Sequence, residues 1–253
     1  MVDKPKRPAR YDLKAADRRR NLLIQVGLTG VVVIFAVALV FYIVTTHGGK
    51  RSSTAPRAVQ VTSSKLVTKE GSKDPKAQVS FFEDFLCPAC GNFERNFGPT
   101  VSHLIDIGAI RADYYMLGFL SRSDNDNYSS RAAAAAYCVA DESIDAFRRF
   151  HTALFSKNIQ PDEQASSFPD NARLTELARE AGAAGKVPEC INSGKYLPLV
   201  NGLASAESIR GTPTIRINGK DWRPTTPQGL VDAVKQVVGD VPGIDTAAVA
   251  PAS

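Results

Sequence analysis

Cysteine and histidine are both scarce in this chain of 253 residues. The three histidines and four cysteines are His47, His103, His151, Cys87, Cys90, Cys138 and Cys190. A structural zinc site needs four such ligands, usually arranged as two closely spaced pairs. Cys87 and Cys90 form a close pair, but no spaced pair of histidines or of other cysteines accompanies them. The spacing argues against zinc, and we expect no metal site.

Charge is absent from residues 21–44, NLLIQVGLTGVVVIFAVALVFYIV. At about 1.5 Å per residue, this run can cross a hydrocarbon core of roughly 30 Å. A buried core helix is the alternative, although unbroken apolarity over this length is unusual in soluble folds. The run is also longer than the apolar core of a cleaved signal peptide, and TTHGGKRSS after it lacks a clear cleavage site. We therefore predict an uncleaved transmembrane anchor at residues 21–44.

Net charge is absent from the rest of the chain once the first twenty residues are set aside. The chain holds 31 basic and 26 acidic side chains, of which residues 1–20 contribute eight and three, so 23 of each remain. A basic tail beside an apolar run fits the positive-inside rule better than a nucleic-acid partner. We expect a single-pass protein of the cell membrane, with a cytoplasmic N-terminus, an extracytoplasmic domain and no nucleic-acid binding.

Residues 45–57, TTHGGKRSSTAPR, have the composition of a flexible linker. The last residues, 241–253, show no hydrophobic periodicity and are predicted to be a disordered tail. Between these segments, residues 58–240 have the size of one ordinary domain.

The domain begins with the pattern of a strand, a helix and a second strand. Residues 79–85 (VSFFEDF) and 110–117 (IRADYYML) have strand patterns. Apolar residues at helical spacing lie between them, and Gly98-Pro99 is expected to kink or split this helix. Cys87 and Cys90 fall on the first turn from strand to helix.

Helical patterns occupy about residues 125–208. They cover residues 131–140, 143–155, 172–181 and 197–209. A strand at 214–217, an Asn218-Gly219 hairpin turn, a short strand through Trp222 and a closing helix at 228–238 follow. The order predicts an α/β sheet interrupted by an inserted α-helical domain.

The Cys87–Cys90 pair is best interpreted as a redox centre. A structural disulfide across two residues closes a minimal loop and stabilises little. At a helix start, the Cys87 sulfur would lie near unpaired N–H groups that favour a thiolate, and Pro88 suits the first helical position. Cys90, one turn along, would be more buried and would resolve a mixed disulfide formed at Cys87. We therefore predict that both cysteines are catalytic.

The sequence Gly211-Thr212-Pro213-Thr214 precedes the later strand. It has two interpretations. The proline could be trans, as most are, in a loop that only introduces the strand. The loop could instead hold a cis-proline packed against the cysteine pair.

Together, VSFFEDFLCPAC and the distant GTPTIRING resemble the thioredoxin-fold family, and specifically its membrane-tethered DsbA-like branch of actinobacteria. The family pattern F-x-D-[FY]-x-C-P-x-C is matched by Phe82, Asp84, Phe85, Cys87, Pro88 and Cys90. The long stretch between the two motifs is similar to the helical insertion of DsbA. The resemblance covers about residues 60–240.

The resemblance implies a thioredoxin fold with an inserted helical domain, here preceded by one transmembrane helix. It implies a thiol:disulfide oxidoreductase whose redox-active disulfide needs no bound cofactor, and a substrate groove shaped by Thr212 and cis-Pro213. The substrates would be reduced exported proteins, and a quinone-linked membrane oxidase of the DsbB or vitamin-K-epoxide-reductase (VKOR) type would reoxidise the enzyme. A membrane-tethered reductant of the cytochrome c maturation type, or a disulfide isomerase, is the alternative.

Two departures from the family pattern affect the expected chemistry. The active-site dipeptide is Pro88-Ala89, where the best-known DsbA type has Pro-His. Alanine offers no donor to a thiolate, so we expect a weaker depression of the Cys87 pKa and a less oxidising couple. Phe81 stands where thioredoxins place a buried acid. Glu83 and Asp84 lie nearby, and we interpret them as surface or capping groups rather than proton relays.

Cys138 and Cys190 both lie in the helical block. Four cysteines allow three connectivities, and with Cys87–Cys90 taken as the active pair only Cys138–Cys190 remains. Free thiols are rare in an oxidising compartment, and the resemblance supports a structural disulfide here.

Overall fold

The structure is a computed structural model that describes residues 58–223 and 225–248. The predicted cytoplasmic tail (1–20), anchor (21–44) and linker (45–57) lie outside these residues. Within the described ranges, no helix combines the length and the apolarity needed to cross a membrane.

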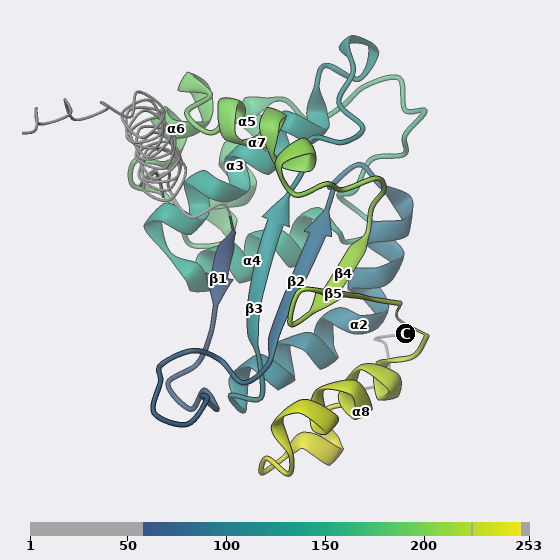
Figure 1. Cartoon of the computed structure of the whole chain (residues 1–253). Helices are drawn as coiled ribbons and strands as arrows, with labels where there is room; N and C mark the ends of the chain where they lie inside the picture. Colours follow the sequence, from purple (N-terminus) through teal and green to yellow (C-terminus); the bar gives the residue numbers. More distant parts are fainter. Residues whose placement is uncertain (1–57, 224, 249–253) are drawn as a thin grey trace, which may run out of the picture. The chain divides into compact units, whose positions relative to one another are not determined.

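A five-stranded sheet with the order β1-β3-β2-β4-β5 lies at the centre of the fold (Figure 1). Its strands are β1 (Val59–Val61), β2 (Gln78–Glu83), β3 (Arg111–Met116), β4 (Thr214–Ile217) and β5 (Lys220–Trp222). β2 and β3 are parallel, and α2 (Pro88–Asp106) connects them. The other three pairings are antiparallel. The α/β fold expected from the strand and helix patterns is confirmed.

The central strand β2 is paired on both sides. Phe82 lies opposite Tyr115 of β3 and opposite Thr214 of β4. Since Thr214 directly follows Pro213, this register brings the proline loop to the end of β2. The same end of β2 leads into the turn that carries Cys87.

The helical insertion is confirmed between β3 and β4, where the chain forms α3 (Tyr128–Glu142), α4 (Ile144–Leu154), α5 (Asn171–Glu180), α6 (Val187–Ser193) and α7 (Leu197–Ala206). Helix α3 packs against the other four and against β3. Its five consecutive alanines, residues 132–136, are all buried. Small side chains allow neighbouring helices to approach from several sides, which explains how a single helix can be the centre of this block.

The predicted split of a helix at Gly98-Pro99 and part of the predicted disordered tail need correction. Helix α2 continues through Pro99 without being split, because buried Phe97, Val101 and Leu104 hold both halves in the core and offset the one lost hydrogen bond. The predicted disordered tail is wrong for residues 241–248. Val241, Ile244 and Ala247 are buried beyond α8 (Pro227–Val238), with a 3-10 turn at Ile244–Thr246.

Two short elements had no sequence prediction. The three residues of β1 and the seven of α6 are too short for a periodic pattern to stand out. β1 exists because it pairs with β3, and α6 because it packs on α3 and α5.

Cys138 of α3 and Cys190 of α6 are joined by a disulfide across 52 residues of sequence. Their Cα atoms lie 5.8 Å apart, which is within the usual range for such a bond. The disulfide therefore ties two helices of the insertion to each other.

Replacing both Cys138 and Cys190 with serine should lower the free energy of unfolding by about 4 kcal/mol, because the unfolded chain regains the entropy of an open loop. The rate at which Cys87 is alkylated should not change. Thermal unfolding and thiol alkylation of the purified variant measure the two effects. Equal losses of stability and of Cys87 reactivity would contradict a purely structural role.

Candidate active site

Cys87 and Cys90 occupy the first turn of α2, directly after β2. Cys87 is the N-cap residue, with an extended backbone, and Pro88 takes the first helical position. Cys87 keeps 7% of its surface exposed and Cys90 none, while Pro88 and Ala89 are exposed. Only the first sulfur is therefore within reach of another protein's thiol.

The two sulfurs have opposite electrostatic surroundings. The pKa of Cys87 is lowered from 9.0 to about 6, first by a hydrogen bond from Cys90 and then by Thr212 and by the backbone N–H groups of Cys90 and Ala89. Burial raises the pKa of Cys90 well above its ordinary value. At neutral pH, Cys87 is a thiolate and Cys90 remains protonated.

The proline loop packs against Cys87. The Thr212–Pro213 peptide bond is cis, and the Sγ of Cys87 lies 3.4 Å from the carbonyl oxygen of Thr212. Of the two interpretations that the sequence left open for this loop, the structure shows the cis-proline.

Asp84 is fully buried and binds two backbone segments together. One carboxylate oxygen accepts a hydrogen bond from the N–H of Leu86 and the other from the N–H of Leu120, both at 2.8 Å. Burial raises the pKa of Asp84 to about 6. The interpretation of Asp84 as a surface or capping group is therefore wrong, because it is buried and binds N–H groups that belong to no helix.

Glu83 is also fully buried, so its interpretation as a surface group is wrong. His151 Nε2 lies 3.0 Å from a carboxylate oxygen of Glu83, and His151 Nδ1 lies 3.8 Å from one of Glu94. Among the described residues, the second oxygens of Glu83 and Glu94 have no hydrogen-bond partner. These three residues form a buried polar cluster behind the cysteines.

Burial keeps this cluster uncharged. It raises the pKa of Glu83 to about 8, raises that of Glu94 well above 4.5, and lowers that of His151. One ligand atom from each residue lies within 4.8 Å of the others, so the cluster has donors of a kind that could hold a metal ion. Sequence reasoning missed it because the three residues come from β2, α2 and α4.

Gln160, in the loop after α4, holds the cysteine turn in place. Its side-chain nitrogen donates hydrogen bonds to the carbonyl oxygens of Phe85 and Cys87, at 3.2 and 3.0 Å. Its side-chain oxygen accepts a hydrogen bond from Arg95, which also donates to the carbonyl of Phe155. A Cβ at Gly91 would stand 1.9 Å from that side-chain oxygen, so a larger residue there would displace the Gln160 side chain.

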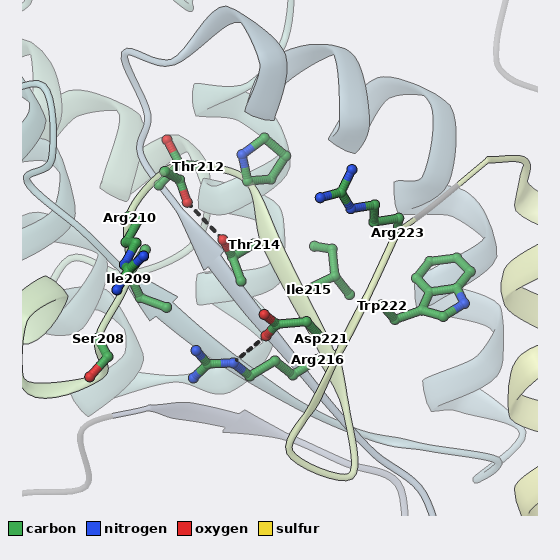
Figure 2. A pocket seen from close by; sticks show the side chains of 12 residues that line it. Ser208, Ile209, Arg210, Thr212, Thr214, Ile215, Arg216, Asp221, Trp222 and Arg223 are labelled. Carbon is green, nitrogen blue, oxygen red and sulfur yellow. Dashed lines mark hydrogen bonds and ion pairs between the residues drawn. The ribbon is translucent and has the colours of Figure 1, made fainter.

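A groove of about 670 Å³ lies along the proline loop (Figure 2). It is lined by residues 208–216 and 221–223, which belong to the loop and to the β4–β5 hairpin. Thr212 and Pro213, predicted to shape a substrate groove, both lie in its wall. The groove is therefore adjacent to the reactive sulfur.

Replacing Gln160 with alanine should raise the pKa of Cys87, because the turn that directs N–H groups at the thiolate loses two hydrogen bonds. Unfolding should also become easier by about 1 to 3 kcal/mol, since the carbonyls of Phe85 and Cys87 each lose a hydrogen bond and only that of Cys87 keeps another, from the N–H of Gly91. The pH dependence of alkylation and denaturant unfolding measure both effects.

Gln164→Ala is the matched control, since in the described part of the chain the side chain of Gln164 makes no hydrogen bond and only its N–H does. If the two variants behaved alike, Gln160 would not position the turn.

Replacing Glu83 with glutamine should flatten the pH dependence of stability. Because its pKa is raised from 4.5 to about 8, the stability linked to Glu83 is fully present below pH 4.5 and is lost as pH rises through about 8. The unfolding free energy of the parent should fall by up to about 1.4 kcal/mol per pH unit between pH 6.5 and 8.

Denaturant unfolding of the oxidised enzyme is the measurement, because neither Cys87 nor Cys90 titrates in the disulfide. The exposed Glu70→Gln serves as the control. A parent and a Glu83→Gln variant with the same slope would refute the prediction.

Comparisons with known proteins agree with this geometry. The family model described as Thioredoxin matches residues 67–236. The reduced DsbA of Mycobacterium tuberculosis is 66% identical, with a TM-score of 0.75 over 76% of this chain and 98% of that one. The reduced disulfide bond oxidoreductase DsbG of the same organism is also 66% identical, with a TM-score of 0.76 over 78% and 95%.

Two other matches cover a smaller share of this chain. MdbA, a thiol-disulfide oxidoreductase of Corynebacterium matruchotii, shares the fold at 22% identity, with a TM-score of 0.56 over 69% of this chain and 87% of that one. The serine/threonine-protein kinase PknE of M. tuberculosis is 33% identical over 57% of this chain, which spans only a quarter of that relative's length. The chain therefore belongs to the thioredoxin family, in its DsbA-like branch of thiol-disulfide oxidoreductases.

Proposed function

We propose that this protein introduces disulfides into reduced exported proteins by exchange through Cys87 and Cys90. The observation that carries the proposal is the contrast between the two sulfurs. The pKa of the accessible Cys87 is lowered to about 6, whereas that of the buried Cys90 is raised.

The exchange begins with the enzyme in its disulfide form. A substrate thiolate attacks the Sγ of Cys87, and the bond to Cys90 breaks with its electron pair on Cys90. Cys90 takes up a proton, since burial disfavours its thiolate. A second substrate thiolate then attacks the substrate sulfur of the mixed disulfide, and Cys87 leaves as a thiolate. Two electrons pass to the enzyme, and the substrate gains one disulfide.

The lowered pKa of Cys87 favours this direction. A thiolate of low pKa leaves readily and stabilises the reduced enzyme, so the disulfide form is the stronger oxidant. Because the pKa is depressed, this stabilisation is fully present above the ordinary value of 9.0 and is lost as pH falls through about 6. Compared with a dithiol of ordinary pKa, the oxidising strength should therefore decline as pH falls from 9.0 toward 6.

The reduced enzyme must pass its two electrons on. A quinone-linked integral membrane oxidase of the DsbB or VKOR type has the right chemistry, and it would accept them at the membrane. The apolar run at residues 21–44 would anchor the domain beside that partner, on the extracytoplasmic side of the cell membrane. A tethered reductant would use the same two cysteines in the reverse direction. Ala89 favours that reductant role, because it offers the Cys87 thiolate no side-chain donor and so makes the couple less oxidising.

A redox titration of Cys87–Cys90, together with refolding of a reduced, unfolded disulfide protein, tests the direction. We expect a reduction potential above thioredoxin's, which is about −270 mV. We also expect alkylation of Cys87 with a midpoint near pH 6 and disulfide formation that is lost in Cys87→Ser. A potential at or below that of thioredoxin, without oxidative refolding, would instead support the reductant.

A further inference from the structure

The groove beside the proline loop contains three arginines and one acid, and one of the arginines is already neutralised. The Nε of Arg216 lies 2.8 Å from a carboxylate oxygen of Asp221, and its guanidinium lies over the ring of Phe82. Arg216 also donates to the backbone carbonyl of Glu207. The pair of Arg216 and Asp221 therefore holds the β4–β5 hairpin and adds no net charge to the groove.

The other two arginines, Arg210 and Arg223, are exposed. In the part of the chain that the structure describes, neither makes an ion pair or a side-chain hydrogen bond. Figure 2 shows Arg210 beside Thr212, while Arg223 lies across the groove next to Trp222. Two unpaired positive charges thus flank the loop that touches Cys87.

The other loop that contacts the cysteine turn carries both signs of charge, since Arg95 of α2 binds the Gln160 side chain there. Gln160, which binds the carbonyl of Cys87, is followed in its loop by Asp162 and Glu163. Neither of these carboxylates makes an ion pair within the described ranges. An acidic group on a bound polypeptide is therefore attracted by Arg210 and Arg223, which no carboxylate of the described residues neutralises.

A polypeptide whose cysteine reaches Cys87 must pass along the proline loop, because the Sγ of Cys87 is 3.4 Å from the Thr212 carbonyl. An extended chain advances about 3.3 Å per residue. Side chains within two or three residues of that cysteine therefore come within reach of Arg210 and Arg223. Charges at such separations interact appreciably at low ionic strength, where the Debye length exceeds about 10 Å.

We propose that Arg210 and Arg223 make the enzyme select reduced polypeptides that carry aspartate or glutamate close to the reacting cysteine. The selection acts at the first step, when the substrate thiolate approaches Cys87. This inference rests on the proposed function, because it names the substrate class of the same site.

Three dithiol peptides test the selection. They are identical except that the two residues flanking the first cysteine are both aspartate, both asparagine or both lysine. The second-order rate of reduction of the Cys87–Cys90 disulfide is measured for each by rapid quench and mass spectrometry. Because neighbouring charges also change the peptide's own thiol pKa, each rate is divided by that peptide's rate with the neutral bis(2-hydroxyethyl) disulfide.

The normalised rate should be about fivefold higher for the aspartate peptide than for the lysine peptide at low salt, as expected for exposed charge pairs. The ratio should approach one in 1 M salt, where the Debye length is about 3 Å. In the double variant Arg210→Gln/Arg223→Gln, the ratio should fall toward one at low salt. An unchanged alkylation rate of Cys87 would show that this variant is folded.

Lys220→Gln is the matched control. It removes the same charge from the same hairpin, but Lys220 pairs with Ile217 at the turn, whereas Trp222 pairs with Ile215 beside the groove. A ratio near one in the parent, or an equal fall in Lys220→Gln, would overturn the selection by these arginines. If none of the three peptides were oxidised, the proposed function itself would fail.

Discussion

Strand β2 is hydrogen-bonded to β3 on one side and to β4 on the other, and the active site depends on both pairings. The parallel pairing with β3 places the turn that carries Cys87 at the end of the sheet. The antiparallel pairing with β4 brings Thr212 beside that turn, although 125 residues of sequence separate it from Cys87. Because side chains alternate along a strand, a shift of one residue in either register would reverse which side chains face each side.

Electrostatics then gives opposite pKa shifts to the thiols of Cys87 and Cys90, which are one helical turn apart. Behind the turn, burial keeps Glu83, Glu94 and His151 neutral, since desolvating a charge costs several kcal/mol. At the surface end of the turn, N–H groups of α2 and the Cys90 thiol stabilise the thiolate of Cys87. The same helix start therefore holds a good leaving group outside and a protonated thiol inside, without a side-chain donor from Ala89.

The helical insertion contributes to the site through a loop rather than through a helix. Gln160, in the loop after α4, binds the carbonyls on either side of Leu86 and is itself held by Arg95. The Cys138–Cys190 disulfide ties α3 to α6 within the same insertion. The insertion thus holds the cysteine turn in place, while the proline loop contacts the Cys87 sulfur and lines the groove that contains Arg210 and Arg223.

The elements that carry the reactive groups could be predicted from the sequence, because a strand, a Cys-Pro-x-Cys turn and a helix start depend on residues close together in the chain. The sequence also predicted the inserted helices, and the family resemblance indicated Thr212 and Pro213.

The sequence did not identify Glu94, His151 or Gln160. His151 and Glu94 occupy ordinary positions in amphipathic helices, and Gln160 belongs to a polar loop like any other. The sequence predicted Glu83 to be a surface group. A carboxylate at the end of an apolar strand has the same neighbours in sequence whether it is exposed to water or buried under a helix, so sequence alone cannot distinguish the two. These roles follow from the folded structure, since burial and hydrogen bonding between distant segments exist only in the assembled fold.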